Sequence, residues 1–229
     1  MVLEISKNSE EYHECIILAG GDAWRLKPDI WVPKPMLQLG KWTLLEYQLK
    51  WLIQHKFVHI IVTSDQEYEI RDSLKQFVEW NIEEYKKGTG GAVMTAADKL
   101  KTDYFYLMNV DDLCFYNPLE LMIDKPRARI VISKPRFGFG IVELRQELVI
   151  GFKEKPLFDK YVSAGHYTFK KSIVDQYFPD NGNLEELVLP RLARERILEN
   201  FRLSSKWMSI NTMKDYMNAK DFLESQDNL

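Results

Sequence analysis

The chain has 229 residues, of which 45% are hydrophobic and 28% charged, a composition typical of a folded protein with a continuous core. Its formal net charge is −3 and it contains no long basic run, so we do not expect nucleic acid to be a partner. No apolar run approaches the roughly 18 residues of a membrane span, and the polar start lacks the apolar core of a secretory signal, so no membrane association is expected.

The two cysteines, Cys15 and Cys114, lie inside apolar stretches. Two thiols cannot form a disulfide or metal-binding framework by themselves. This cysteine usage fits a reducing compartment, and we expect a cytoplasmic protein. The chain has no internal repeat and no long linker, which favours a single domain over residues 1–229.

The first half of the chain alternates strand patterns with helix patterns. Apolar residues 15–18 and 59–63 predict two buried parallel strands, and the spacing of apolar residues over 44–53 predicts an amphipathic helix between them. The other elements expected here are helices over residues 67–78 and 92–100 and strands over residues 80–85 and 104–108. Such alternation predicts an α/β fold with a mostly parallel sheet.

From residue 130 the pattern changes to short strands separated by turns, which predicts a mixed or antiparallel extension. The elements expected in this half are strands over residues 130–132, 141–144, 149–152 and 207–210 and helices over residues 184–198 and 212–223.

Phosphate-binding features follow the first expected strand. Ligands of parallel sheets bind beyond the carboxyl ends of the strands. Gly20 and Gly21 follow residue 18 closely, and their N–H groups can approach phosphate oxygens with no Cβ in the way. Arg25 adds positive charge, and Lys34 is held between two prolines that restrict the backbone. The alternative interpretations are a tight glycine turn and a surface lysine.

Three further loops have unusual composition. Residues 88–92 are small and leave room for a planar base, although a flexible turn explains them equally well. Asp111 and Asp112 follow the strand expected at 104–108, and adjacent carboxylates are costly unless they are solvated or bound to a cation. Glu154 and Lys155 follow residues 149–152, where they can meet sugar hydroxyls and a phosphate or form only a charged turn.

The order and spacing of these motifs resemble the nucleotidyltransferase family that makes NDP-sugars. That family includes mannose-1-phosphate and heptose-1-phosphate guanylyltransferases and glucose-1-phosphate thymidylyltransferases. The segments that carry the resemblance are residues 18–26, 33–35, 88–92, 109–111, 154–156, 163–165 and 207–212. The resemblance implies a Rossmann-like fold with a mixed, mostly parallel central sheet flanked by helices. It also implies a small antiparallel sugar-binding extension.

The resemblance further implies that an NTP and a sugar-1-phosphate react to form an NDP-sugar and pyrophosphate, with Mg²⁺ as cofactor. Residues of about 12–125 would bind the nucleotide, and those of about 126–229 the sugar phosphate. The implied catalytic residues are Arg25, Lys34 and Asp111, and the implied nucleotide-binding residues are Leu18, Ala19, Gly20, Gly21, Glu83, Gly88, Thr89 and Gly90. The implied sugar-phosphate-binding residues are Asn109, Glu154, Lys155, Ser163 and Gly165.

The chain departs from the family pattern at several of these positions. Ala23 and Trp24 replace the usual glycine and threonine of the phosphate loop, and Val110 and Ser163 replace a glycine and an asparagine. Ser209 stands where a second metal-binding aspartate is usual, and a hydroxyl is a poorer Mg²⁺ ligand than a carboxylate. The resemblance implies that Asp111 binds Mg²⁺, and the candidates for a second metal ligand are Asp112, Ser209 and Asn211, among which the sequence does not choose.

Two other functions therefore stay open. One is a cytidylyltransferase that acts on a polyol or choline-type phosphate, and the other is a homologue that binds sugar nucleotides without turnover. The sequence leaves the base, the sugar and a homo-oligomeric state undecided.

Overall fold

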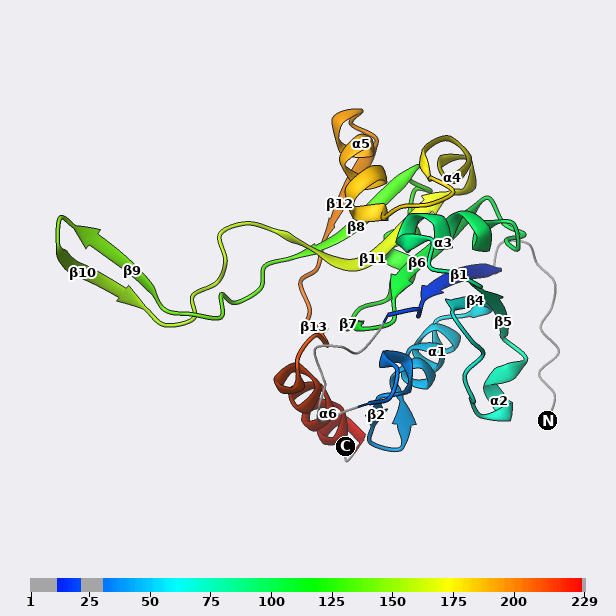
Figure 1. The fold of residues 1–229 in the computed structure, drawn as a ribbon, viewed down its shortest axis with the longest axis horizontal. Coiled ribbons are helices and arrows are strands. Elements are labelled where there is room, and N and C mark those ends of the chain that lie inside the picture. Colours follow the sequence, from blue (N-terminus) through cyan, green and yellow to red (C-terminus); the bar gives the residue numbers. More distant parts are fainter. Residues whose placement is uncertain (1–11, 22–30, 228–229) are drawn as a thin grey trace.

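The computed structural model describes residues 12–21 and 31–227, and a seven-stranded sheet forms the centre of this part of the chain (Figure 1). The strand order is β12-β8-β11-β6-β1-β4-β5, and every neighbouring pair is parallel except those that involve β11. The strands are β1 (His13–Leu18), β4 (Phe57–Ser64), β5 (Val78–Ile82), β6 (Tyr104–Asn109), β8 (Ala128–Ser133), β11 (Val162–Lys170) and β12 (Leu198–Arg202). The mixed, mostly parallel sheet predicted from the sequence is confirmed.

Helices cover both faces of this sheet. The helices are α1 (Leu44–Gln54), α2 (Asp72–Lys75), α3 (Gly88–Ala97), α4 (Lys171–Tyr177), α5 (Leu189–Arg194) and α6 (Met213–Asp227). Successive residues of β1 face opposite sides, so Ile17 packs in the core that contains Leu49 of α1, whereas Ile16 packs in the core that contains Val93 of α3. No helix within the described ranges is long and apolar enough to cross a membrane.

Helix α1 begins where the sequence predicts it because its first turn is capped. The Thr43 side chain accepts a hydrogen bond from the Glu46 N–H, and the Glu46 carboxylate accepts one from the Thr43 N–H at 3.0 Å. Glu46 also accepts a hydrogen bond from the Arg71 N–H, which ties α1 to the segment before α2.

Several expected elements differ in the structure. Of the helix expected over 67–78 only α2 forms, because Tyr68 and Ile70 are drawn into the core and the chain enters β5 at Val78. The helix expected over 184–198 is a π-helical turn, η4 (Leu184–Val188), followed by α5, and Leu198 already belongs to β12. The strand expected over 207–210 is β13 (Trp207–Ser209), which pairs with the short β7 (Asp112–Cys114) outside the central sheet.

Strand β11 was not expected, because its sequence lacks a continuous apolar pattern. Its buried residues include His166 and Thr168, which are polar. Both are fully hydrogen-bonded: the Thr168 hydroxyl donates to the Phe105 carbonyl at 2.9 Å, and His166 contacts Tyr106 and the Asp112 carbonyl. Polar residues that find partners in the fold can fill the centre of a sheet without a hydrophobic pattern.

The antiparallel extension predicted for the second half is a hairpin of β9 (Ile141–Arg145) and β10 (Leu148–Lys153). It stands away from the rest of the molecule at the end of two long connecting segments (Figure 1). The remaining short elements are β2 (Gln38–Leu39), β3 (Trp42–Thr43), and the 3₁₀ turns η2 (Lys34–Met36) and η3 (Pro118–Met122).

A buried charge cluster lies near the amino ends of the central strands. Glu14 is inaccessible to solvent, and one of its oxygens lies 2.5 Å from Nδ1 of His59, whose Nε2 lies 2.9 Å from Glu79. The hydrogen bond with Glu14 raises the pKa of His59 above its ordinary value of 6.5, outweighing the opposing effect of burial. Burial raises the pKa of Glu14, but hydrogen bonds from His59 and Thr102 outweigh it and lower the pKa below 4.5.

This cluster predicts a pH window for stability. A raised histidine pKa stabilises the fold below pH 6.5, and this contribution is lost as the pH rises through the folded pKa of His59. A lowered glutamate pKa stabilises the fold above pH 4.5, and this contribution is lost as the pH falls through the folded pKa of Glu14. We expect both contributions to be complete between these two values. Urea unfolding from pH 6 to pH 9 should show His59→Gln losing less stability than the wild type as the pH rises. Parallel pH profiles for the two proteins would contradict this.

Candidate functional site

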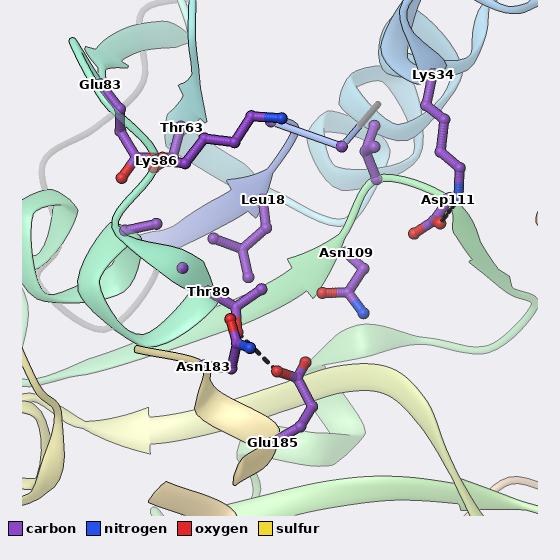
Figure 2. A pocket seen from close by; sticks show the side chains of 15 residues that line it. Leu18, Lys34, Thr63, Glu83, Lys86, Thr89, Asn109, Asp111, Asn183 and Glu185 are labelled. Atoms are coloured by element: carbon purple, nitrogen blue, oxygen red, sulfur yellow. Dashed lines mark hydrogen bonds and ion pairs between the residues drawn. The ribbon is translucent and has the colours of Figure 1, made fainter. Parts of the chain in front are cut away.

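A pocket of about 310 Å³ opens at the carboxyl ends of β1, β4 and β6 (Figure 2). This is the edge at which ligands of parallel sheets bind. Nine residues assigned from the sequence line it: Leu18, Gly20, Gly21, Lys34, Glu83, Gly88, Thr89, Asn109 and Asp111. The strand ends bring together segments that are far apart in the chain.

Lys34 and Asp111 form an ion pair on one side of the pocket (Figure 2). Lys34 lies in the turn η2 between two prolines, so its backbone is stiff, and its side chain is only 13% exposed. Its Nζ donates to the Asp111 carboxylate and, at 3.2 Å, to Oδ1 of Asn211. A fixed cation and a partly exposed carboxylate therefore meet at the pocket wall.

Asn211 reaches this wall because β13 pairs with β7. The Ile210 N–H donates to the Asp111 carbonyl at 2.9 Å, which holds the segment after β13 against the loop after β6. Asn211 Nδ2 in turn donates to the Ser209 hydroxyl at 2.8 Å. Of the second metal ligands that the sequence left open, Asn211 is the one whose oxygen points to the Lys34–Asp111 pair.

Asp112 points into the protein. Its carboxylate accepts hydrogen bonds from Asn109 Nδ2 at 3.1 Å and from Trp207 Nε1 at 3.0 Å, and the residue is only 7% exposed. Burial, together with the negative charge of Asp111, raises the pKa of Asp112 to about 7, against the opposing hydrogen bonds. The two adjacent carboxylates thus differ in environment, and Asp112 braces the loop that presents Asp111.

His166 supports the same loop from behind. Its ring is fully buried, with Nε2 2.8 Å from the Asp112 carbonyl and Nδ1 2.5 Å from the Tyr106 hydroxyl. Burial lowers the pKa of His166 to about 4, so the imidazole is neutral at pH 7. The ring is therefore a packing and hydrogen-bonding element, away from the pocket.

Glu83 lies on the opposite side of the pocket from Lys34 (Figure 2). Its Oε1 has no hydrogen-bond partner within the described residues. Burial raises the pKa of Glu83, and a hydrogen bond from the Lys87 backbone and the Lys87 charge oppose this. A Cβ at Gly20 would lie 4.0 Å from Glu83 Oε2, so the glycine and the carboxylate share one wall. A buried acceptor without a donor is energetically costly, so a hydrogen bond to it would stabilise this wall of the pocket.

The glycine segment after β5 does not form the loop that the sequence suggested. Residues 88–91 are the first turn of α3, four residues before the expected start, and the N–H groups of Gly90 and Gly91 donate to the Gly182 carbonyl at 2.9 and 3.3 Å. A Cβ on Gly90 would meet that carbonyl oxygen at 2.9 Å. Gly90 is therefore needed for close packing behind the pocket and does not line it, whereas Gly88 and Thr89 do.

Other assigned residues also lie outside the pocket lining. Ala19 is buried, with its N–H bonded to the Thr63 carbonyl, and Ser163 is bonded to the Tyr167 hydroxyl at 3.0 Å. Glu154 and Lys155 lie at the root of the hairpin. Both side chains are more than half exposed, and Lys155 Nζ lies 3.3 Å from Glu154 Oε1. Gly165 packs directly against Asp112.

Arg25, with Ala23 and Trp24, is outside the described residues.

Several pocket residues were missed from the sequence. Lys86 is a positively charged residue two positions before Gly88. Its place beside the glycine segment in the sequence could have indicated that it lines the pocket. Asn183 and Glu185 carry no sequence signal, because they reach the pocket from the start of the π-helical turn and the residue before it, nearly 100 residues later. Thr89 donates to Glu185 at 2.6 Å and accepts from the Leu184 N–H at 2.8 Å, which joins the two segments.

Residues 14–226 match the family model described as nucleotidyl transferase. The chain belongs to the nucleotidyl transferase family. Because the match covers nearly the whole of the described chain, the central sheet, the pocket and the hairpin all lie within the family's domain.

Relatives and solved structures agree with this membership. The chain is 26% identical to the mannose-1-phosphate guanyltransferase of Saccharomyces cerevisiae, over 89% of this chain and 63% of the yeast protein. It is also 26% identical to the mannose-1-phosphate guanylyltransferase catalytic subunit beta of Xenopus tropicalis, over 89% of this chain and 62% of that protein. The chain thus spans less than two thirds of these relatives.

The crystal structure of HddC from Yersinia pseudotuberculosis superposes with a TM-score of 0.71 at 23% identity, over 92% of this chain and 99% of HddC. This likeness confirms the Rossmann-like nucleotidyltransferase fold predicted from the sequence.

Proposed function

We propose that this nucleotidyl transferase joins a guanylyl group from GTP to a sugar-1-phosphate, with release of pyrophosphate. The observation that carries the proposal is the polar arrangement of one pocket: Lys34, Asp111 and Asn211 on one wall and the unpaired acceptor of Glu83 on the other. The names of the guanyltransferase relatives support the guanylyl group, as does the structure of HddC in complex with GMP-PN.

The chemistry requires alignment and charge neutralisation rather than a protein nucleophile. An oxygen of the sugar phosphate attacks the α-phosphorus of the NTP, the new P–O bond forms, and the electron pair of the broken bond leaves with pyrophosphate. Lys34 places positive charge beside the phosphates in a fixed position, so little reorganisation is needed as charge moves to the leaving group. We assign phosphate binding to Gly20, Gly21 and Arg25 on the sequence pattern.

The oxygen ligands at the pocket wall fit Mg²⁺. Asp111 offers a carboxylate that is 20% exposed, and Asn211 offers an amide oxygen beside it. The described residues contain no group of three or more His, Cys, Asp or Glu that could enclose a metal by themselves. This suits an ion held by one or two protein oxygens together with substrate phosphates and water, as Mg²⁺ is in many nucleotide enzymes. When bound, Mg²⁺ would neutralise charge on the transferred and leaving phosphates.

Glu83 is the residue we assign to the base. Guanine presents two adjacent donors, N1–H and the N2 amino group, and a carboxylate can accept from both. Uracil and thymine present only one ring donor, and cytosine and adenine present an amino group beside a ring acceptor. The unpaired Oε1 of Glu83 therefore favours guanine, because guanine leaves neither carboxylate oxygen without a donor.

Glu83→Gln should weaken GTP binding selectively. Replacing one carboxylate oxygen with an amide donor removes a charged acceptor, so we expect KM for GTP to rise by about 10- to 100-fold with a smaller change in kcat. Steady-state kinetics with GTP as the varied substrate will measure both. Glu84→Gln is the matched control, because Glu84 is the next residue and is exposed to solvent. Equal effects of the two substitutions would remove Glu83 from the base site.

We place the sugar phosphate on the side of the pocket that faces residues 126–229, within one domain. Asn109 lines the pocket and is the best-placed of the assigned sugar-side residues. Ser163 and Gly165 lie behind it, and Glu154 and Lys155 lie on the hairpin root. We therefore propose that Asn109 contacts the sugar phosphate and that Gly165 acts by positioning Asp112.

Pyrophosphate release tests the proposal. GTP, CTP, UTP, dTTP and ATP are each combined with a panel of hexose- and heptose-1-phosphates and of polyol and choline phosphates, with and without Mg²⁺. Mg²⁺-dependent release with GTP and one sugar-1-phosphate is the expected result. Release with CTP and a polyol or choline phosphate would support the cytidylyltransferase instead. Saturable binding of GTP or a GDP-sugar without release would identify a binding protein.

A further inference from the structure

The hairpin of β9 and β10 carries an unusual concentration of exposed apolar side chains. Of the eighteen large apolar side chains that are exposed within the described residues, eleven lie between residues 137 and 161. We call residues 134–161 the arm, which consists of the hairpin and two connecting segments (Figure 1). Soluble monomers rarely expose apolar side chains at such density in one place.

The two faces of the hairpin differ in character. The strand register pairs Leu144 with Val149 and Val142 with Phe152, and side chains of such pairs lie on the same face. These four side chains are 46 to 65% exposed and form a continuous apolar face. The opposite face carries Ile141, Glu143, Arg145, Leu148 and Lys153, with an ion pair between Lys153 and Glu143 at 3.7 Å. The hairpin is therefore amphipathic, like a strand pair with one face against a core.

The connecting segments hold the hairpin away from the body of its own chain. They are paired with each other: the Phe137 N–H donates to the Pro156 carbonyl and the Phe158 N–H to the Pro135 carbonyl, both at 2.8 Å. The rings of Phe137 and Phe158 stack with centroids 6.2 Å apart. This ladder makes the root of the arm a structured ribbon, and every residue of β9 beyond it is exposed.

We propose that the apolar face of the arm packs against the same face of a second copy of this chain. An isolated two-stranded hairpin is marginally stable in water, and a second apolar layer supplies the core that it lacks. A face without charge is complementary to itself, as a two-fold contact requires, while the charged face stays in solvent on both copies. The proposal is independent of the catalytic activity.

The exposed area is sufficient for such a contact. Seven apolar side chains of the arm, on the four-residue face and beside it, are at least 46% exposed: Phe139, Val142, Leu144, Val149, Ile150, Phe152 and Leu157. Together they expose on the order of 750 Å², which is close to the roughly 800 Å² that each partner contributes to a stable interface. The Phe152 ring also lies over Gly140, where a Cβ would meet its Cζ at 2.4 Å, so the face extends toward the root of the arm.

Two substitutions of the same residue type separate this contact from a general effect of charge. Leu144 is 65% exposed on the apolar face, and Leu148 is 70% exposed on the opposite face at the other side of the turn. Leu144→Asp places two charges in the proposed interface, one from each copy, and should weaken dimerisation on the order of 100-fold. Leu148→Asp should leave the dimer intact.

Sedimentation velocity of the full chain over a range of concentrations will measure this, with melting temperature as a check of folding. The expected result is a dimer for the wild type and for Leu148→Asp and a monomer for Leu144→Asp. Val149→Asp, on the same face, should repeat the loss and serves if Leu144→Asp does not fold. A wild type that stays monomeric at all concentrations would overturn the proposal, as would a dimer that resists the substitutions on both faces.

Discussion

Asp111→Ala should abolish most turnover while leaving the fold intact. Its carboxylate is partly exposed, contacts Lys34 at the pocket wall and supplies the one carboxylate that we assign to Mg²⁺. Loss of a group that stabilises charge in a transition state typically lowers kcat by about 10²- to 10³-fold. An ion pair at a partly exposed wall contributes about 0–1 kcal/mol to stability, so the melting temperature should fall by no more than roughly 2–4 °C.

Pyrophosphate release at saturating GTP and Mg²⁺, with thermal melting of the same samples, checks this prediction. Asp72→Ala is a suitable control, because Asp72 is an aspartate with a 95% exposed side chain in α2, far from the pocket, and it also pairs with a lysine. A large drop in melting temperature for Asp111→Ala would show that the carboxylate is a structural element. A variant with wild-type turnover would remove Asp111 from the reaction.

Gly165→Ala should destabilise the protein severely. Gly165 has a φ of +73°, which disfavours any residue with a Cβ, and an added Cβ would lie 1.8 Å from Asp112 Oδ2. Asp112 is bonded to Asn109 and Trp207 and is buried, so it cannot move aside without leaving these polar groups unpaired. Strain and clash together should cost about 3 kcal/mol or more, a fall in melting temperature of roughly 6–12 °C.

Gly138→Ala is the matched control for this substitution. Gly138 has no heavy atom within 4 Å of an added Cβ and lies in the connecting segment of the arm, so its melting temperature should stay within about 2 °C of the wild type. Thermal unfolding of the three proteins under the same conditions decides the matter. If Gly165→Ala has the same melting temperature as the wild type, the contact of β11 with the Asp112 loop leaves room for a Cβ at residue 165. Because Asp112 braces the loop of Asp111, a folded Gly165→Ala variant should also have reduced kcat.

Much of the central sheet could be predicted from the sequence. Strands β1, β4 and β6 and helix α1 are local patterns, since a buried strand needs a run of apolar residues and an amphipathic helix needs them at three- and four-residue spacing. The carboxyl ends of parallel strands meet at one edge, which indicated where the site lies, and the resemblance to the family assigned Lys34 and Asp111 to it although 77 residues separate them.

The tertiary structure decided which of two adjacent carboxylates faces the pocket. Asp111 and Asp112 have the same chemistry, and only the pairing of β7 with β13, residues about 95 positions later, turns Asp112 inward to Trp207. The same pairing brings Asn211 to Lys34. Gly90 supports the packing behind the pocket for a similar reason, because the Gly182 carbonyl occupies the space that a side chain would need.

The sequence by itself therefore determined the α/β fold, the family and the edge of the sheet where chemistry is placed, because these depend on local periodicity and on the order of motifs. The tertiary structure alone decided the direction of individual side chains, the unpaired oxygen of Glu83 and the apolar face of the arm. These features depend on contacts between segments far apart in the chain. Local patterns of hydrophobicity do not encode which long-range partner a polar group will find.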